Sequence, residues 1–390
     1  MFYSITLWIL IFALTYLIAT SFILIRNRLE LTALKSEHNE NNNKPKISVC
    51  IPARNEEKNI GTLLNSLVDQ QYSTYDIHVL DDQSTDQTGE IVQSFIEQHH
   101  YIKLHKGLEK PDDWLGKPWA CHQLSNYANG RYLLFLDADT VVDTSFLTNI
   151  AATFQRHDIQ MVTVWPRQIL VTFWEKSVIP LIYYALVTLL PSIYVFRDPR
   201  WMPKFLTTYF RTSFAAACGQ CIAFEKEAYT DIGGHQAVKD RVVEDVEMAK
   251  QVKRCGYRMR MFHGVGSISC RMYQNENEML AGFRKNFFPG FNHSQLLFIC
   301  AATLHIIVFI MPIITLITSI VLFNAVLFFL SVACISLILI HRLILSVWFE
   351  WDPIYSFTHP IAVLWFQRLG IISLTDYWLG KKNEWKGRKL

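Results

Sequence analysis

Two groups of aspartates stand directly after short apolar runs, where their carboxylates could bind a ligand. Asp81 and Asp82 follow one run, and Asp137 and Asp139 follow another. If the runs are strands of an open α/β sheet, these carboxylates lie at the carboxyl ends of strands, where such sheets bind their ligands. A carboxylate there can accept hydrogen bonds from a base or a ribose. Helix capping explains either group alone equally well, but both groups in this order favour ligand binding.

The Asp-x-Asp spacing of 137–139 suits a hard divalent cation held through oxygen. Mg²⁺ or Mn²⁺ at such a site would neutralise the charge of a diphosphate leaving group.

A third acidic pair, Glu244 and Asp245, precedes a helical pattern over 246–252. Asp245 could act as a general base that takes a proton from an acceptor hydroxyl. Acidic residues are also favoured at helix starts by the helix dipole, so the residues alone leave both interpretations open.

The elements that would position these side chains alternate between strand-like and helix-like patterns. The sequence predicts strands at 47–51, 77–80, 132–136 and 161–164, and helices at 60–67 and 91–95. This alternation is typical of βαβ units with a mostly parallel sheet. We expect one soluble α/β domain over 46–290.

An almost unbroken apolar stretch opens the chain and is long enough to cross a bilayer. We expect a transmembrane anchor over 1–26, followed by a solvated linker over 36–46. The basic residues Arg26, Arg28 and Lys35 follow the apolar stretch, so the positive-inside rule places the α/β domain in the cytoplasm.

Further apolar segments predict a multi-pass membrane protein. Residues 296–322 and 325–340 suit a transmembrane hairpin within 293–342 that closes at His341 and Arg342. The segment 177–196 contains two prolines and charged flanks, which favours a helix at the membrane interface. Within 343–390 we expect a re-entrant or interfacial segment at 360–374 and a basic cytoplasmic tail.

Composition narrows the function classes. The formal net charge of +3 and the scattered basic residues give no electrostatic case for nucleic-acid binding. The eight cysteines lack the regular spacing of a disulfide-rich domain, and such scattered cysteines are typical of a reduced, cytoplasmic domain. Cys218 and Cys221 form a close pair, but no second pair or ligand-spaced histidine accompanies them, so zinc and redox use are disfavoured.

These motifs together resemble a family: over about 46–290 the chain is similar to family 2 glycosyltransferases. The matching pieces, in order, are 51–57 (Ile-Pro-Ala-Arg-Asn-Glu-Glu), 81–86 (Asp-Asp-Gln-Ser-Thr-Asp), 116–117, 137–139, 219–220 and 244–245. The resemblance implies a Rossmann-like GT-A fold and metal-dependent transfer of a hexose from a nucleotide sugar.

The resemblance also implies roles for individual residues. It assigns nucleotide-sugar binding to Pro52, Ala53, Arg54, Asn55, Glu56, Asp81, Asp82, Lys117, Asp137 and Ala138. Asp139 would coordinate Mg²⁺ or Mn²⁺ beside the diphosphate. Gly219, Gln220 and Glu244 would shape the acceptor side, and Asp245 would be the base of an inverting single displacement.

One departure concerns polymer synthesis. Processive members of the family carry a Gln-x-x-Arg-Trp motif, whereas this chain has Gly-Phe-Arg-Lys-Asn-Phe at 282–287. Arg284 and Lys285 could still face the diphosphate, or they could bind anionic headgroups before the membrane hairpin. The departure favours a single sugar transfer over chain elongation.

A finer resemblance concerns the acceptor. Residues 116–121, 271–274 and 384–388 make the chain similar to bacterial carotenoid-acid glycosyltransferases of the staphyloxanthin pathway. This implies UDP-glucose as donor and a membrane-borne apocarotenoid carboxylic acid as acceptor. An ionised acid has no proton to lose, so Asp245 would then mainly orient the acceptor. Alternatives are a hopanoid, polyprenyl-phosphate or glycerolipid acceptor, a polysaccharide synthase, or a non-catalytic membrane scaffold.

Overall fold

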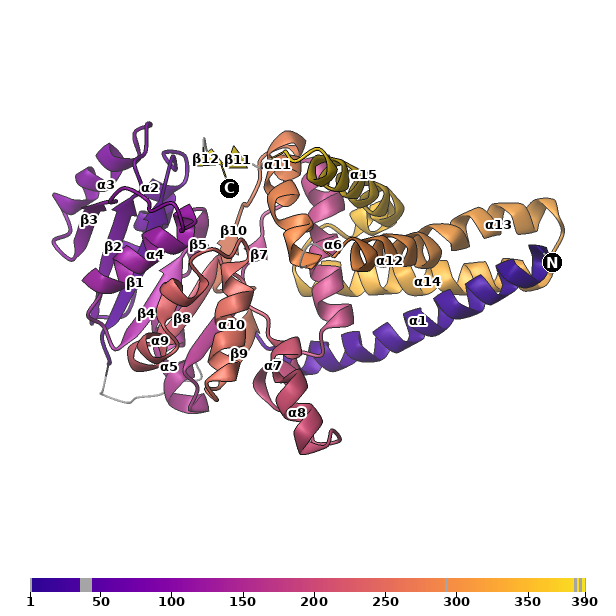
Figure 1. Cartoon of the computed structure of the whole chain (residues 1–390), viewed down its shortest axis with the longest axis horizontal. Helices are drawn as coiled ribbons and strands as arrows, with labels where there is room; N and C mark the ends of the chain where they lie inside the picture. The colour runs from indigo at the N-terminus through magenta and orange to yellow at the C-terminus, as the bar shows by residue number, and fades with distance from the viewer. Residues whose placement is uncertain (1, 36–43, 292–293, 382–383, 386–387, 390) are drawn as a thin grey trace. The chain divides into compact units, whose positions relative to one another are not determined.

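The computed structural model describes residues 2–35, 44–291, 294–381, 384–385 and 388–389. The described chain divides into two compact units (Figure 1). The globular unit comprises Leu31–Ile169 and Ser192–Met272, and the helical unit comprises Met1–Glu30, Leu170–Pro191 and Tyr273–Leu390. Most of the expected linker over 36–46, and parts of the basic tail, lie outside the described residues.

A seven-stranded sheet forms the centre of the globular unit, in the order β3-β2-β1-β4-β8-β6-β9. Its strands are β1 (Ile47–Ala53), β2 (Tyr75–Asp81), β3 (Ile102–Lys106), β4 (Tyr132–Leu136), β6 (Met161–Trp165), β8 (Cys221–Glu225) and β9 (Met259–His263). β8 runs antiparallel to both of its neighbours, and the other described pairs of this sheet are parallel. The prediction of a mostly parallel sheet is confirmed, and each of the four predicted strands is present.

Helices cover this sheet, and three short strands form a second, separate sheet. The helices are α2 (Ile60–Val68), α3 (Thr88–Ile96), α4 (Gly116–Tyr127), α5 (Phe146–His157), α7 (Ile193–Phe196), α8 (Lys204–Phe210), η1 (Arg211–Phe214), α9 (Lys226–Asp231), η2 (Gly234–Val238) and α10 (Glu244–Arg254). A three-stranded sheet pairs β10 (Ile268–Cys270) with β5 (Thr140–Val142) and β7 (Arg167–Gln168). Both predicted helices, 60–67 and 91–95, are found as α2 and α3.

Burial of β-branched side chains explains why the central strands form. Ile47, Val49 and Ile51 of β1 are each fully buried and belong to one core with Leu134 of β4. Each such side chain contributes about 1.5–3 kcal/mol by leaving water. Parallel register sets Ala53 opposite Asp81, so the ends of β1 and β2 meet at one edge of the sheet.

The helical unit contains the long apolar helices. Its elements are α1 (Phe2–Glu30), α6 (Phe173–Leu189), α11 (Glu276–Phe287), η3 (Pro289–Phe291), α12 (Gln295–His305), η4 (Ile306–Ile310), α13 (Met311–Val321), α14 (Ala325–Trp348), η5 (Pro353–Thr358), α15 (His359–Trp378), β11 (Glu384–Trp385) and β12 (Arg388–Lys389). Among the described residues, three helices are long and apolar enough to span a membrane: Tyr3–Glu30, Gln295–Val321 and Ala325–Trp348. The second contains a π-helical turn, η4, which ends at Ile310, just before Met311 and Pro312. Such a turn accommodates the missing N–H and the bulk of a proline.

The second helix of the predicted hairpin continues past its expected end. The prediction closed the hairpin at His341 and Arg342, but α14 continues to Trp348 and both residues are 1% exposed. His341 bonds the hydroxyls of Ser21 at 2.7 Å and Tyr184 at 2.9 Å. Both ring nitrogens of His341 therefore have hydrogen-bond partners inside the helical unit. The helix does not need to end here to expose this side chain to water.

The apolar segment 177–196 forms two helices where one was predicted. α6 ends at Leu189 and α7 begins at Ile193. Leu190 adopts an extended backbone, as expected for a residue directly before a proline. Farther along the chain, the predicted segment 360–374 lies within α15, one uninterrupted helix of 20 residues.

Candidate active site

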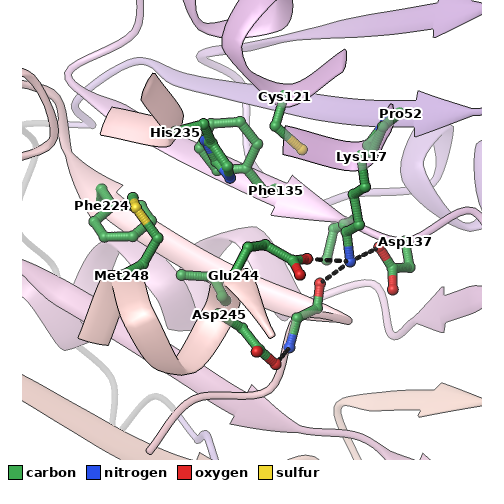
Figure 2. A pocket seen from close by; sticks show the side chains of 13 residues that line it. Pro52, Lys117, Cys121, Phe135, Asp137, Phe224, His235, Glu244, Asp245 and Met248 are labelled. Atoms are coloured by element: carbon green, nitrogen blue, oxygen red, sulfur yellow. Dashed lines mark hydrogen bonds and ion pairs between the residues drawn. The ribbon is translucent and has the colours of Figure 1, made fainter. Parts of the chain in front are cut away.

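Lys117 occupies the centre of a polar cluster in the globular unit (Figure 2). It lies in the first turn of α4, where Pro118 is tolerated because the first helical N–H groups need no partner within the helix. Its Nζ is 2.7 Å from Asp137 Oδ1 and 3.3 Å from Glu244 Oε1, and it donates a hydrogen bond to the Gly219 carbonyl at 3.1 Å. Two carboxylates and one backbone carbonyl, from three distant sequence motifs, thus meet at one ammonium group.

Electrostatics keep this ammonium charged. Burial alone lowers the pKa of Lys117, but the carboxylates of Asp137 and Glu244 outweigh burial and raise that pKa well above its usual value. A permanent positive charge held between carboxylates suits the neighbourhood of an anionic leaving group.

Asp245 lies one residue farther along the first turn of α10 than Glu244. Its Oδ2 accepts a hydrogen bond from the Gly219 N–H at 2.8 Å, and its Oδ1 accepts one from the Val246 N–H at 2.8 Å. Burial and the neighbouring Glu244 raise the pKa of Asp245 to about 6, against the opposing effects of Lys117 and the two N–H donors. A carboxyl that titrates near 6 can both accept and release a proton close to neutral pH.

The pocket beside this cluster has one polar and one apolar wall. Lys117, Asp137, Glu244 and Asp245 gather on one side, as Figure 2 shows. The remaining lining residues are mostly apolar or aromatic and come from β4, β8, α4, α10 and η2, namely Cys121, Phe135, Leu136, Ile222, Phe224, His235 and Met248, with Pro52 at the end of β1. Burial lowers the pKa of His235 to about 3, so this histidine is neutral and forms a hydrogen-bonded pair with Tyr229 at 2.8 Å.

Asp139 carries an unsatisfied buried oxygen. Its Oδ1 is buried and has no hydrogen-bond partner in the described part of the chain. Burial, followed by the negative charges of Asp137 and Glu56, raises the pKa of Asp139 to about 7. No group of three or more Asp, Glu, His or Cys side chains able to hold a metal occurs among the described residues. A cation here would therefore take its further ligands from substrate phosphates and water, as Mg²⁺ commonly does.

The predicted nucleotide-binding turn after β1 is locked to the turn after β2. The Arg54 guanidinium donates to the carbonyls of Asp82 at 2.6 Å and Gln83 at 3.2 Å. The Asn55 side-chain oxygen accepts from the Thr85 N–H at 2.9 Å, and the Glu56 N–H donates to Thr88 Oγ1 at 2.8 Å. The two turns therefore form one hydrogen-bonded surface at the edge of the sheet.

The two predicted aspartates of the second turn differ in their surroundings. Asp81 Oδ1 accepts a hydrogen bond from the Ser84 N–H at 2.8 Å within the turn, whereas the N-cap position of the next helix, α3, is occupied by Gln87. Asp82 is 4% exposed, and its N–H donates to the Ala53 carbonyl at 2.8 Å. Pro52 and Ala53 are paired in the sheet with β2, and Ala138 is buried beside Asp137.

Gly219 and Gln220 occupy different environments although they are adjacent. The backbone of Gly219 joins Lys117 and Asp245, through its carbonyl and its N–H respectively. The side chain of Gln220 is buried, donates to Cys270 Sγ at 2.8 Å and accepts from Gln168 at 3.0 Å. The structure therefore brings the Gly219 backbone into the Lys117 cluster and gives the Gln220 side chain a buried packing environment.

Arg284 and Lys285 lie in α11 of the helical unit. Arg284 forms an ion pair with Asp376 of α15 in the same unit. The choice between a diphosphate contact and a headgroup contact for these two residues stays a prediction.

The sequence did not indicate a role for three residues near the site, namely Asp86, Thr88 and His235. Thr88 and Asp86 fix the turn after β1, because Thr88 Oγ1 accepts from Glu56 and Asp86 Oδ2 accepts from the Glu57 N–H at 3.0 Å. The Ser-Thr-Asp run after Asp82 was an available signal, since such residues commonly bond neighbouring backbone N–H groups. His235 gave no comparable sequence signal.

Comparisons with known proteins agree with this architecture. Residues 48–233 match the family model described as glycosyl transferase family 2, and residues 199–390 match that of glycosyl transferase family 21. A 4,4'-diaponeurosporenoate glycosyltransferase of Staphylococcus haemolyticus is 26% identical over 252 residues, covering 64% of this chain and 63% of the relative. A protein of the same name from Staphylococcus aureus (strain MRSA252) is 27% identical over 258 residues, with the same coverage. The match thus spans less than two thirds of these relatives' length.

One solved structure resembles almost the whole chain. The mannosyltransferase PcManGT from Pyrobaculum calidifontis, solved with GDP-Man and Mn²⁺, has a TM-score of 0.53 and 16% sequence identity. The likeness covers 97% of this chain and 100% of that protein. At this identity the likeness supports the fold alone.

Proposed function

We propose that this chain is a family 2 glycosyltransferase that transfers a single sugar from a nucleotide sugar to an apolar acceptor carried in the membrane. In its sharpest form, the donor is UDP-glucose and the acceptor is an apocarotenoid carboxylic acid. The observation that carries the proposal is the Lys117 cluster, in which Asp137, Glu244 and the Gly219 backbone hold one ammonium group beside Asp245.

The donor binds at the joined turns after β1 and β2. Asp82 and the Pro52–Glu56 turn accept the nucleoside, and Lys117 and Asp137 lie toward the diphosphate. The locked turns support this role because a rigid, hydrogen-bonded surface costs little entropy when it orders a ligand. Lys117 stabilises the negative charge that develops on the leaving diphosphate.

Asp139 supplies the protein ligand for a divalent cation, Mg²⁺ or Mn²⁺. Its buried, unsatisfied Oδ1 fits a hard cation, whose charge would offset the cost of burying this carboxylate. The cation, when bound, neutralises part of the diphosphate charge.

Asp245 faces the acceptor. An acceptor oxygen attacks the anomeric carbon, the bond from that carbon to the diphosphate oxygen breaks, and the configuration inverts. With a hydroxyl acceptor, the proton released passes to Asp245. With a carboxylic acid acceptor, already ionised near neutral pH, no proton is transferred and Asp245 orients the nucleophile.

Two observations support the choice of an apolar acceptor: the apolar helices of the helical unit, and the names of the curated relatives. In the described part of the chain, three helices are apolar enough to span a membrane, and the curated relatives carry the name 4,4'-diaponeurosporenoate glycosyltransferase. We further propose a multi-pass arrangement with the N-terminus outside and the globular unit in the cytoplasm, based on the basic residues that follow α1.

A donor and acceptor screen tests the proposal. Detergent-purified full chain is incubated with Mg²⁺ or Mn²⁺, UDP-glucose, GDP-mannose or UDP-GlcNAc, and one acceptor each from the carotenoid-acid, hopanoid, polyprenyl-phosphate and glycerolipid classes. Mass spectrometry then identifies any product. We expect a monoglucosyl ester of the carotenoid acid. A product on another lipid would overturn the acceptor, a polymer would overturn single transfer, and no product from any pair would overturn the proposed transfer reaction.

A further inference from the structure

A cluster of basic side chains is buried inside the helical unit. It consists of His341 and Arg342 of α14 and His359 of α15. Arg342 and His341 are each 1% exposed, and His359 is fully buried. The ring of Tyr184 from α6 lies 5.7 Å from that of His341 and 5.1 Å from that of His359, centroid to centroid. Three helices therefore converge on these side chains.

The hydrogen bonding of this basic cluster is incomplete. His341 is satisfied at both nitrogens, by Ser21 and Tyr184. Arg342 donates from Nη2 to the Tyr355 carbonyl at 3.1 Å, but its Nε and Nη1 have no partner in the described part of the chain. Both ring nitrogens of His359 are likewise buried without a partner among the described residues. Several donors are thus left without a partner in the described part of the chain.

Among the described residues, the basic cluster also lacks a counter-charge. Within residues 2–35, 44–291 and 294–381, no carboxylate forms an ion pair with Arg342. The ionisable groups that act on His359 are Arg342, His305 and His341, and none of these three is acidic. An uncompensated buried arginine is strongly unfavourable, and ionisable residues within membrane helices usually mark binding or transport sites.

We propose that the basic cluster of His341, Arg342 and His359 binds the oxyanion of a membrane lipid within the helical unit. A guanidinium presents planar donors that match a carboxylate or phosphate, and an imidazole N–H can add another donor. The proposal concerns the helical unit alone and holds whichever acceptor the enzyme uses.

An apolar setting argues for a lipid over a soluble anion. Phe309 in the π-helical turn packs against His359, with ring centroids 4.7 Å apart, and Phe309 is 3% exposed. Arg342 itself lies in α14, a helix apolar enough to span a membrane. A ligand that brings its own apolar chain gains from such surroundings, whereas a free ion would lose its hydration without that gain.

The test uses the full chain, purified in neutral detergent, and measures both Tm and bound mass. The four probes are phosphatidylglycerol, oleate, methyl oleate and inorganic phosphate. We expect phosphatidylglycerol or oleate to bind as a single molecule and raise Tm, and methyl oleate to do neither, because it keeps the chain and lacks the charge. Binding of phosphatidylglycerol would identify the bound oxyanion as a phosphate, and binding of oleate would identify it as a carboxylate. An equal effect of inorganic phosphate, or of methyl oleate, would overturn the proposal.

Arg342→Met removes the guanidinium and keeps an apolar side chain. We expect this variant to bind the effective lipid more weakly by about tenfold or more, since hydrogen bonds to charged groups are among the strongest. Arg26→Met is the matched control, because Arg26 is an exposed arginine of the same unit that pairs with Glu30. Unchanged lipid binding by Arg342→Met would refute the proposal. If that variant does not fold, His359→Phe serves in its place, with the same expected loss and the same refuting result.

Discussion

The Asp245 carboxylate is held by the backbone N–H of Gly219, at 2.8 Å, across 26 residues of sequence. The same glycine accepts a hydrogen bond from Lys117 through its carbonyl at 3.1 Å. One peptide segment therefore sets the positions of both the candidate base and the candidate diphosphate-binding cation. A substitution of Lys117 or of Asp245 should therefore alter the position or the pKa of the other side chain. Substitutions in this cluster can be distinguished by their effects on rate, pH profile and stability.

Asp245→Asn should separate the two possible roles of this residue. Asparagine keeps the size and an acceptor oxygen but cannot take a proton. With a hydroxyl acceptor, we expect the transfer rate to fall by about 10²–10⁴-fold, the usual contribution of a positioned general base. With a carboxylic acid acceptor the fall should be much smaller. The measurement is kcat for both acceptor classes, and equal losses with the two would contradict proton transfer as the role.

The pH dependence of transfer should follow the titration of Asp245. The ionised form is needed to accept a proton, and the pKa is about 6, so kcat/KM with a hydroxyl acceptor should decline as pH falls below about 6. The stability effect has the opposite sign. Because the pKa is raised from 3.8, the folded chain binds more protons than the unfolded chain between these values, and this stabilisation is lost as pH rises through 6. A rate that stays flat from pH 8 down to 5 would disprove the assignment.

Lys117→Met should move this pH profile. The positive charge of Lys117 lowers the pKa of Asp245, so its removal should shift the acid limb of the profile to higher pH. Lys103→Met is a suitable control because Lys103 is an exposed lysine of β3 in the same unit. The comparison of the two midpoints checks the coupling, and an identical midpoint in the Lys117 variant would rule it out.

The strands of the globular unit could be predicted because their sequences carry a local signal. β4 reads as a continuous apolar run, and all five of its residues are buried. Asp137 and Asp139 follow it directly, so their place at the edge of the sheet required no knowledge of the rest of the fold. The link from Asp245 to Gly219 could not be predicted in the same way, because it depends on how α10 and β8 pack.

The polar residues of the helical unit show where prediction from the sequence fails. His341 and Arg342 looked like a helix end because charged and polar residues usually reach water there. The partner of His341, Ser21, is 320 residues away in the sequence, and Tyr184 is 157 residues away. A pattern read along one segment carries no information on such partners, so α14 was predicted too short.

Removal of divalent cations should abolish transfer without unfolding the chain. EDTA treatment is expected to stop the reaction, and added Mg²⁺ or Mn²⁺ should restore it. Asp139→Asn should abolish this restoration. Because Asp139 Oδ1 is buried without a partner among the described residues, the variant should also match or exceed the Tm of the metal-free wild type. Calorimetry and product formation check the two parts, and full activity in EDTA would exclude a required metal.

Gly219→Ala should disturb Lys117 and Asp245 together. A Cβ at this position would lie 3.1 Å from Lys117 Nζ and 3.3 Å from Asp245 Oδ2, closer than ordinary van der Waals contact. Both side chains must shift, so we expect a loss of kcat with little change in Tm, because the affected atoms end flexible side chains. Gly61→Ala is the control, since its Cβ would meet only Ile91 at an ordinary 3.5 Å, within α2. That variant should keep full activity and gain up to about 1 kcal/mol of stability from the better helix former. Wild-type kcat in Gly219→Ala would show that the Gly219 peptide does not position the reacting groups.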